Sequence, residues 1–81
     1  MGPMKKKNRY VLCIKNEGQE VSLEPRKVYQ VIPEPESEKH LMIRVVDETD
    51  EDYLFPASYF VPIELPGAAQ KLFPEIPTQV T

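Results

Sequence analysis

The stretch DYLFPASYFVPIEL, residues 52–65, decides the fold that this sequence predicts. It holds four of the seven aromatic residues and two of the nine prolines of the chain. A short apolar strand, a turn that begins at Pro56 and a second apolar strand follow one another. We expect this segment to close a small β-barrel, with one turn of 3₁₀ helix at residues 56–59 as the connector. Pro62 implies that the last strand lies at a sheet edge or carries a bulge.

Five short segments are rich in the apolar, β-branched and aromatic residues that favour strands. They are residues 9–15, 27–32, 40–47, 53–55 and 60–65. Apolar residues recur at every second position of segment 40–47, which is typical of a strand with one buried face. We therefore predict an all-β, five-stranded antiparallel barrel. Its core is expected to contain Leu41, Ile43, Val45, Leu54, Phe60, Val28, Val31 and either Val11 or Leu12.

Polar and proline-containing segments connect these strands. A long loop at residues 16–24 follows the first strand, and its EVSL segment, residues 20–23, is expected to fold back over the core. Residues 33–39 contain two prolines and four charges, so we expect a solvated loop there. Five of the six residues 47–52 are acidic and form the next hairpin turn. Arg44 is expected to pair with Glu51 or Asp52 across that hairpin, at an exposed site where such a pair contributes little.

The chain of 81 residues is long enough for one domain. We expect a disordered basic arm at residues 1–8, the barrel at residues 9–65, and a flexible, proline-containing tail at residues 66–81, with one possible helical turn at 68–72. Residues 1–3 stand before a second methionine and are typical of a cloning remnant. No segment has the apolar length of a membrane span, and no signal peptide is recognisable, so a monomeric cytoplasmic protein is expected.

Charge is distributed unevenly along the chain. The net charge is −3, but Lys5, Lys6, Lys7 and Arg9 carry four of the ten positive charges. The remainder of the chain is therefore strongly acidic and repels the phosphates of a nucleic acid. A role with DNA or RNA would depend on the basic arm alone.

Residues with catalytic or metal-binding chemistry are few. Cys13 is the only cysteine, which excludes an internal disulfide and a CxxC metal site; within its apolar strand it is expected to be a small buried hydrophobe. His40, the only histidine, and Ser58 could form a base and nucleophile, but a single histidine at a strand start is more often a surface residue. The acidic hairpin lacks the D-x-D-x-D-G spacing of a calcium loop. We expect no enzyme activity, no metal and no cofactor.

Two motifs resemble those of Src-homology-3 domains. LFPASY at residues 54–59 is similar to the closing segment of that family, in which a Phe/Ile-Pro-x-x-Tyr run forms the 3₁₀ turn. EVSL at residues 20–23, followed by KVYQVI at residues 27–32, is similar to the family's run before its second strand. The resemblance covers residues 10–65 in the right order. It implies a Src-homology-3-like barrel.

The resemblance also implies a shallow groove for an extended, proline-rich peptide. Its candidate residues are Tyr53, Pro56 and Tyr59, together with Glu17, Glu20 and Glu24 of the long loop. The alternative is that Pro56 only fixes the turn while the tyrosine rings cover the barrel end. The groove tryptophan of the family would fall near residues 40–42, where this chain has none, and only Tyr10 matches the family's first tyrosine motif. The Gly-Asp pair after the family's E-L-S-F run reads Arg26–Lys27 here.

A second resemblance is closer but brings no activity. Residues 44–56 match the pattern R-V-V-D-E-x-x-E-D-Y-L-F-P, which a group of short bacterial proteins shares. Residues 71–77 also read basic-x-x-Pro-x-x-Pro, the ligand pattern of Src-homology-3 domains, so the tail could dock on its own barrel or on a neighbour's. We expect a non-catalytic interaction module or accessory protein that binds a protein or peptide. The alternative is a nucleic-acid-associated regulator that uses the basic arm.

Overall fold

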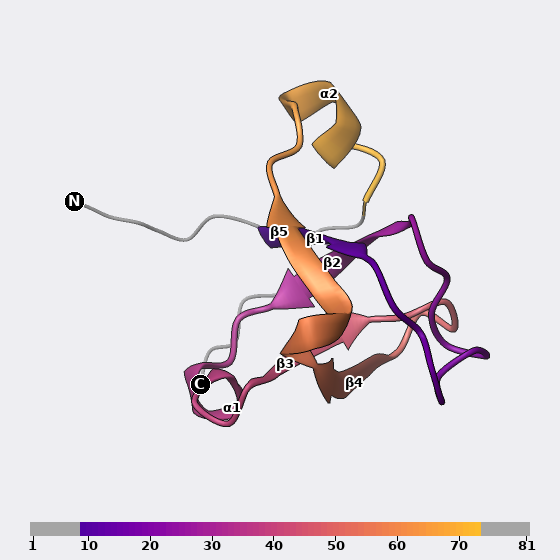
Figure 1. The fold of residues 1–81 in the computed structure, drawn as a ribbon. Helices are drawn as coiled ribbons and strands as arrows, with labels where there is room; N and C mark the ends of the chain where they lie inside the picture. Colours follow the sequence, from indigo (N-terminus) through magenta and orange to yellow (C-terminus); the bar gives the residue numbers. More distant parts are fainter. Residues whose placement is uncertain (1–8, 74–81) are drawn as a thin grey trace.

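Five short antiparallel strands form one sheet in the computed structural model, which describes residues 9–73 (Figure 1). The strands are β1 (Arg9–Cys13), β2 (Val28–Ile32), β3 (Met42–Val46), β4 (Asp52–Pro56) and β5 (Phe60–Ile63), in the spatial order β4-β3-β2-β1-β5. Three helical turns accompany them: α1 (Pro35–Glu38), the 3₁₀ helix η1 (Ala57–Tyr59) and α2 (Gly67–Gln70). The all-β fold class with five antiparallel strands is confirmed.

The 3₁₀ helix η1 joins the two edge strands, β4 and β5, at the position that the sequence predicts. Pro56 precedes it with φ −60° and ψ 132°, which turns the chain out of β4. Within residues 9–73 the two edges are not paired with each other, so the barrel is open. Pro62 lies opposite Val11 in β5, and β5 is an edge strand. The prediction of an edge position for Pro62 is therefore confirmed.

One hydrophobic core fills the concave side of the sheet. Phe60 makes edge-on ring contacts with Tyr29 and Phe55, with ring centroids 6.4 Å and 6.2 Å apart. Edge-to-face contacts of this kind stabilise beyond the area that they bury. Leu23, from the long loop, is completely buried in the same cluster, so EVSL does fold back over the core. The buried members are Val11, Cys13, Leu23, Tyr29, Val31, Ile43, Val45, Phe55 and Phe60.

Three predicted core residues, Leu41, Leu54 and Val28, are not core members, and the first two are exposed. Leu41 is 77% exposed because it precedes β3 with φ 63°, so the alternation that begins at Met42 does not include it. Leu54 is 40% exposed, because it lies opposite Arg44 on the outer face, while Phe55 lies opposite Ile43 and enters the core. A shift of one residue exchanges the faces of a strand.

The remaining expected core positions divide between the two faces. Val11 is buried in the core, which resolves the alternative between Val11 and Leu12. Val28 is only partly buried and is not a core member, because it pairs with Leu12 on the outer face of the sheet. Cys13 is completely buried, as its apolar strand predicts.

The segment between β2 and β3 contains the short helix α1, where the sequence predicted only a loop. Pro35 occupies the first turn, where its missing N–H costs nothing. Glu36 and Glu38 also lie in this turn, where negative charge is favourable. Glu38 accepts a hydrogen bond from Arg9 at 2.9 Å, which attaches α1 to the start of β1.

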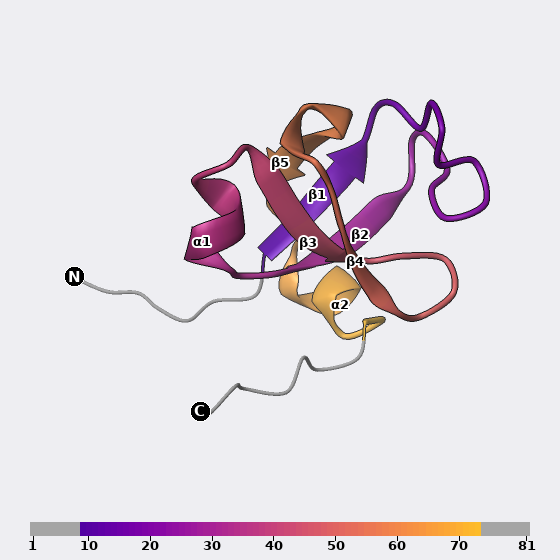
Figure 2. The ribbon, with the colours of Figure 1, turned by 90° about the horizontal axis from the view of Figure 1, so that it is seen from below.

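The C-terminal segment covers part of the outer face of the sheet. The ring of Phe73 packs on Tyr10 of β1, with ring centroids 5.2 Å apart, and Tyr10 is buried. α2 lies on the opposite side of the molecule from η1 (Figures 1 and 2). The predicted arm at residues 1–8 and most of the predicted tail, residues 74–81, lie outside the described residues. In the part of the chain that is described, no helix has the length and apolarity needed to cross a membrane.

Candidate interaction surface around the 3₁₀ helix

The helix η1 is held between two long connections of the fold. Residues 14–27 lie on one side of it, and residues 33–41, with α1, lie on the other (Figure 2). The amide of Ala57 donates to the carbonyl oxygen of Leu41 at 2.9 Å. The amides of Ile14 and Lys15 donate to the carbonyl oxygen of Tyr59 at 2.8 Å and 3.3 Å. We call the side chains of Ile14, Leu41, Pro56 and Tyr59 the η1 surface.

Leu41 is the most unusual member of the η1 surface. Its φ of 63° lies in the left-handed region, which is costly for a leucine by about 1 kcal/mol. Two backbone hydrogen bonds maintain this conformation. The amide of Leu41 donates to the carbonyl oxygen of Glu38 at 3.1 Å, and the carbonyl oxygen of Leu41 accepts from the amide of Ala57. The side chain is nevertheless 77% exposed, and that of Ile14 is 50% exposed. Strained backbone and exposed apolar side chains are both features that concentrate at functional sites.

Tyr59 has a structural role and also contributes to the surface. Its ring packs against the core, and its hydroxyl donates to the carbonyl oxygen of Glu17 at 2.7 Å. This bond attaches the long loop to η1. The side chain remains partly exposed, as does that of Pro56. The two sequence-predicted groove residues Pro56 and Tyr59 therefore lie within four residues on one turn, beside the long loop.

Tyr53 lies elsewhere. It is in β4, opposite Val45, and its hydroxyl donates to the carboxylate of Glu51 at 2.6 Å. Among the described residues its ring makes no ring contact with Tyr59. The side chain is 48% exposed and lies towards the acidic hairpin. The structure does not bring Tyr53 into the η1 surface.

The three acidic residues of the long loop differ in their contacts. Glu17 adjoins the η1 surface through its backbone bond with Tyr59. The carboxylate of Glu20 accepts from the amide of Gly18 at 3.2 Å, and the φ of 81° at Gly18 allows this turn. The amide of Glu24 donates to the hydroxyl of Tyr29 at 2.8 Å. In residues 9–73 none of the three glutamates forms a salt bridge, so the loop presents unpaired negative charge.

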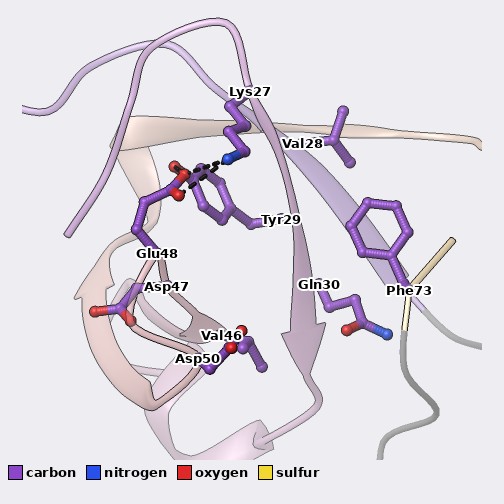
Figure 3. Close-up of a pocket in the computed structure, with 9 residues that line it drawn as sticks. All are labelled: Lys27, Val28, Tyr29, Gln30, Val46, Asp47, Glu48, Asp50 and Phe73. Carbon is purple, nitrogen blue, oxygen red and sulfur yellow. Dashed lines mark hydrogen bonds and ion pairs between the residues drawn. The ribbon is translucent and has the colours of Figure 1, made fainter.

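A polar cluster anchors the far end of the long loop. Lys27 and Tyr29 converge on the carboxylate of Glu48, which accepts from the Tyr29 hydroxyl at 2.6 Å and from the Lys27 ammonium at 2.7 Å (Figure 3). The amide of Glu48 also donates to the carbonyl of Ser22. Burial, and then the bond to Glu48, raise the pKa of Tyr29, so its hydroxyl stays protonated and remains a donor. These contacts fix the loop against the hairpin between β3 and β4.

A shallow cavity of about 160 Å³ lies beside this cluster, against Phe73 (Figure 3). The carboxylate of Glu48 already pairs with Lys27 and Tyr29, so these three side chains are engaged within the protein. We assign no ligand to this cavity. The lining residues are Lys27, Val28, Tyr29, Gln30, Val46, Asp47, Glu48, Asp50 and Phe73.

The groups considered for catalysis or metal binding do not converge. His40 and Ser58 are both exposed, and no hydrogen bond joins their side chains in residues 9–73. Burial raises the pKa of the Cys13 thiol, which donates to the carbonyl of Lys15 at 3.1 Å. One oxygen of Asp47 accepts from both the amide and the hydroxyl of Thr49, which shapes the hairpin. Over the described range no three metal-ligating side chains come together.

Arg44 connects three elements on the outer face. It donates to Asp52 at 3.1 Å, which confirms one of the two predicted partners, and to Glu34 at 3.1 Å, which the sequence did not suggest. Hydrogen bonds from Ser37, and then from Arg44, lower the pKa of Glu34. The arginine thus holds the connection before α1 against β3 and β4.

Two members of the η1 surface, Ile14 and Leu41, were not predicted as site residues. Leu41 was assigned to the core because the alternation of β3 continues into it. Ile14 belonged to the predicted first strand, residues 9–15, which in the structure ends two residues earlier, at Cys13. The exposure of both side chains depends on how the backbone closes around η1. No local sequence signal reports that closure.

Comparison with known proteins assigns no family. No family model, no curated protein and no solved structure matches this chain. The resemblance to Src-homology-3 domains therefore rests on the sequence motifs, and it stays a prediction.

Proposed function

We propose that this protein is a non-catalytic interaction module that binds an extended segment of a partner protein across the η1 surface. The observation that carries the proposal is the exposed Leu41. This residue is 77% exposed and its backbone has a φ of 63°, and its carbonyl accepts from the amide of Ala57, the first residue of η1 between Pro56 and Tyr59. A strained and exposed leucine costs stability, and that cost is explained if the side chain contacts a partner.

The η1 surface is arranged before any partner binds. Backbone hydrogen bonds attach η1 to residues 14 and 15 on one side and to Leu41 on the other. The Tyr59 hydroxyl adds a third attachment, to Glu17. Binding to a surface whose backbone is already fixed loses less conformational entropy, which favours affinity.

The chemistry of the surface indicates the class of partner. Its apolar members suit an extended segment with exposed aliphatic or proline side chains. The adjacent loop contributes the unpaired carboxylates of Glu17, Glu20 and Glu24, which favour a basic residue next to that apolar part. We therefore propose a partner segment that combines apolar residues with at least one lysine or arginine.

The test compares two exposed aliphatic residues. Leu41→Ser removes the apolar side chain from the η1 surface, and Val21→Ser is the matched control, because Val21 is 85% exposed and is not a member of the η1 surface. Wild type and both variants are used to capture proteins from a cell extract, and the captured proteins are quantified by mass spectrometry. Both variants are expected to keep the wild-type circular dichroism spectrum.

The proposal predicts a protein that wild type and Val21→Ser capture equally and that Leu41→Ser loses. Equal capture by all three proteins, with Leu41→Ser folded, would exclude the η1 surface. A salt titration with random-sequence DNA tests the alternative role of the basic arm. A steep loss of binding between low and high salt would support that alternative.

A further inference from the structure

Strand β4 leaves one backbone edge unpaired in the described chain. β4 ends the sheet order and pairs only with β3. Its residues Asp52, Tyr53 and Leu54 are all exposed, in contrast to the buried pattern of the central strands. β4 lies at the periphery of the ribbon (Figure 1).

The hydrogen bonds at the two ends of the β3–β4 pair show which groups face outward. The amide of Asp47 donates to the carbonyl oxygen of Glu51 at 2.9 Å, and the amide of Ala57 donates to the carbonyl oxygen of Leu41 at 2.9 Å. Both bonds continue the residue pairing of β3 with β4. Hydrogen-bonded pairs alternate with non-bonded pairs in an antiparallel ladder. The N–H and C=O groups of residues 53 and 55 therefore point to β3. Those of Asp52 and Leu54 point to the free edge.

The same rule explains the proline at the other edge. The amide of Ile14 donates to the carbonyl oxygen of Tyr59 at 2.8 Å, which continues the residue pairing of β1 with β5. Because Pro62 is three residues further along, it belongs to a pair that is not hydrogen-bonded, and its backbone groups face away from β1. Proline without an N–H blocks that edge to a further strand. In β4 a proline occurs only at the last residue, Pro56. Residues 52–54 contain neither proline nor lysine, the residues that usually protect an edge.

We propose that the free edge of β4 is a docking site for an extended segment of a partner protein, which adds to the sheet as an antiparallel strand. The outward N–H and C=O groups of Asp52 and Leu54 offer four backbone hydrogen bonds to it. An apolar residue of the partner lies opposite Leu54, and a basic residue two positions later lies opposite Asp52. The hydrogen-bonding residues of this site, Asp52 and Leu54, are not members of the η1 surface, which begins at the end of the same strand with Pro56.

Charge complementarity supports the basic residue. The end of β4 at Asp52 adjoins Asp50 and Glu51, both exposed and without a salt bridge in residues 9–73. Among the described residues, Asp52 forms its one salt bridge with Arg44, which also pairs with Glu34. A lysine or arginine at this end would reduce the repulsion among these carboxylates. An acidic partner would increase it.

The test uses a peptide of defined sequence. The acetylated and amidated peptide Thr-Thr-Val-Thr-Lys-Thr places valine opposite Leu54 and lysine opposite Asp52. It is titrated into the ¹⁵N-labelled full-length protein, and amide chemical shifts are followed. We expect the largest changes at Asp52 and Leu54, with a dissociation constant of about 1 mM, which is typical of a weak contact. The same peptide with glutamate in place of lysine is expected to bind about tenfold less tightly, which matches about 1.4 kcal/mol.

Two proline variants test the register. Leu54→Pro removes an N–H that faces the free edge, so the protein is expected to fold and to lose the peptide response. Tyr53→Pro removes an N–H that faces β3, so it is expected to unfold the hairpin. The free protein gives an independent measurement, because the amides of Asp52 and Leu54 should exchange with deuterium much faster than those of Tyr53 and Phe55.

Three results would overturn the proposal. The first is slow exchange at Asp52 and Leu54 in the free full-length protein, which would mean that the edge is already covered. The second is the absence of shift changes up to about 10 mM peptide, a range that would detect any contact of the expected strength. The third is a response confined to Ile14, Leu41 and Tyr59, which would place the peptide on the η1 surface and support the proposed function instead.

Discussion

Replacement of Leu23 by alanine tests whether the long loop is a structural part of the core. Leu23 is completely buried, and its carbonyl accepts from the Asn16 side chain at 3.1 Å. Removing three buried carbon atoms from a leucine typically costs about 2 to 5 kcal/mol, and we expect about 3 kcal/mol here. A domain of 81 residues has a total stability of about 4 to 12 kcal/mol. The change should therefore remove a large part of the stability.

The matched control is Val21→Ala, two residues earlier in the same loop. Val21 is 85% exposed, so its truncation should change the stability by less than about 0.5 kcal/mol. For Leu23→Ala, the midpoint of thermal unfolding should fall by about 12 to 24 °C. The midpoint of urea unfolding should fall by about 2 M, measured by far-ultraviolet circular dichroism. A loss below about 1 kcal/mol for Leu23→Ala, or equal losses for the two variants, would refute the burial of this loop.

Two further predictions concern the core face and the dependence of stability on pH. Ile43→Asp should abolish the dispersed NMR spectrum, because Ile43 is buried and a buried charge without a partner is costly. The control Leu41→Asp should remain folded, because Leu41 is exposed. Loss of the dispersed spectrum in both variants would contradict the register of β3. Hydrogen bonds from Lys27, and then from Tyr29, lower the pKa of Glu48, so the unfolded chain takes up this proton at a higher pH than the folded protein does. The stability from Glu48 is therefore present at neutral pH and is lost as the pH falls below about 4, through the lowered pKa. The midpoint of urea unfolding should differ less between neutral and acidic pH for Glu48→Gln than for wild type. An equal difference in the two proteins would show that Glu48 does not cause the loss of stability at acidic pH.

The strands and turns of this fold could be predicted because their signals are local. The alternation in residues 42–46, the acidic hairpin and the prolines at 56 and 62 each restrict only a few neighbouring residues. The choice between Leu54 and Phe55 as the core residue could not be made in this way. Both are apolar, and which one is buried depends on the pairing of β4 with β3. The helix α1 was missed because two prolines indicate a break, although Pro35 in fact begins a helical turn.

The candidate site was predictable in part for the same reason. Pro56 and Tyr59 belong to one short motif, and the structure places both at η1. Leu41 could not be recognised, because its left-handed backbone is maintained by Ala57, sixteen positions later in the chain. Tyr53 appeared to belong with Tyr59 because the two are close in sequence. The turn at Pro56 separates them.

The position of β1 between β2 and β5 has a consequence for the way the protein is made. β1 is the first described strand to leave the ribosome, yet its neighbour β5 and its cover Phe73 are the last described segments to be synthesised. The hairpin of β3 and β4 can form as soon as its own residues emerge, since its contacts are local. Pairing of β1 with β5 instead requires a long loop to close, which slows folding. The nascent chain therefore carries β1 with one edge paired to β2 and the other edge open until β5 has been synthesised.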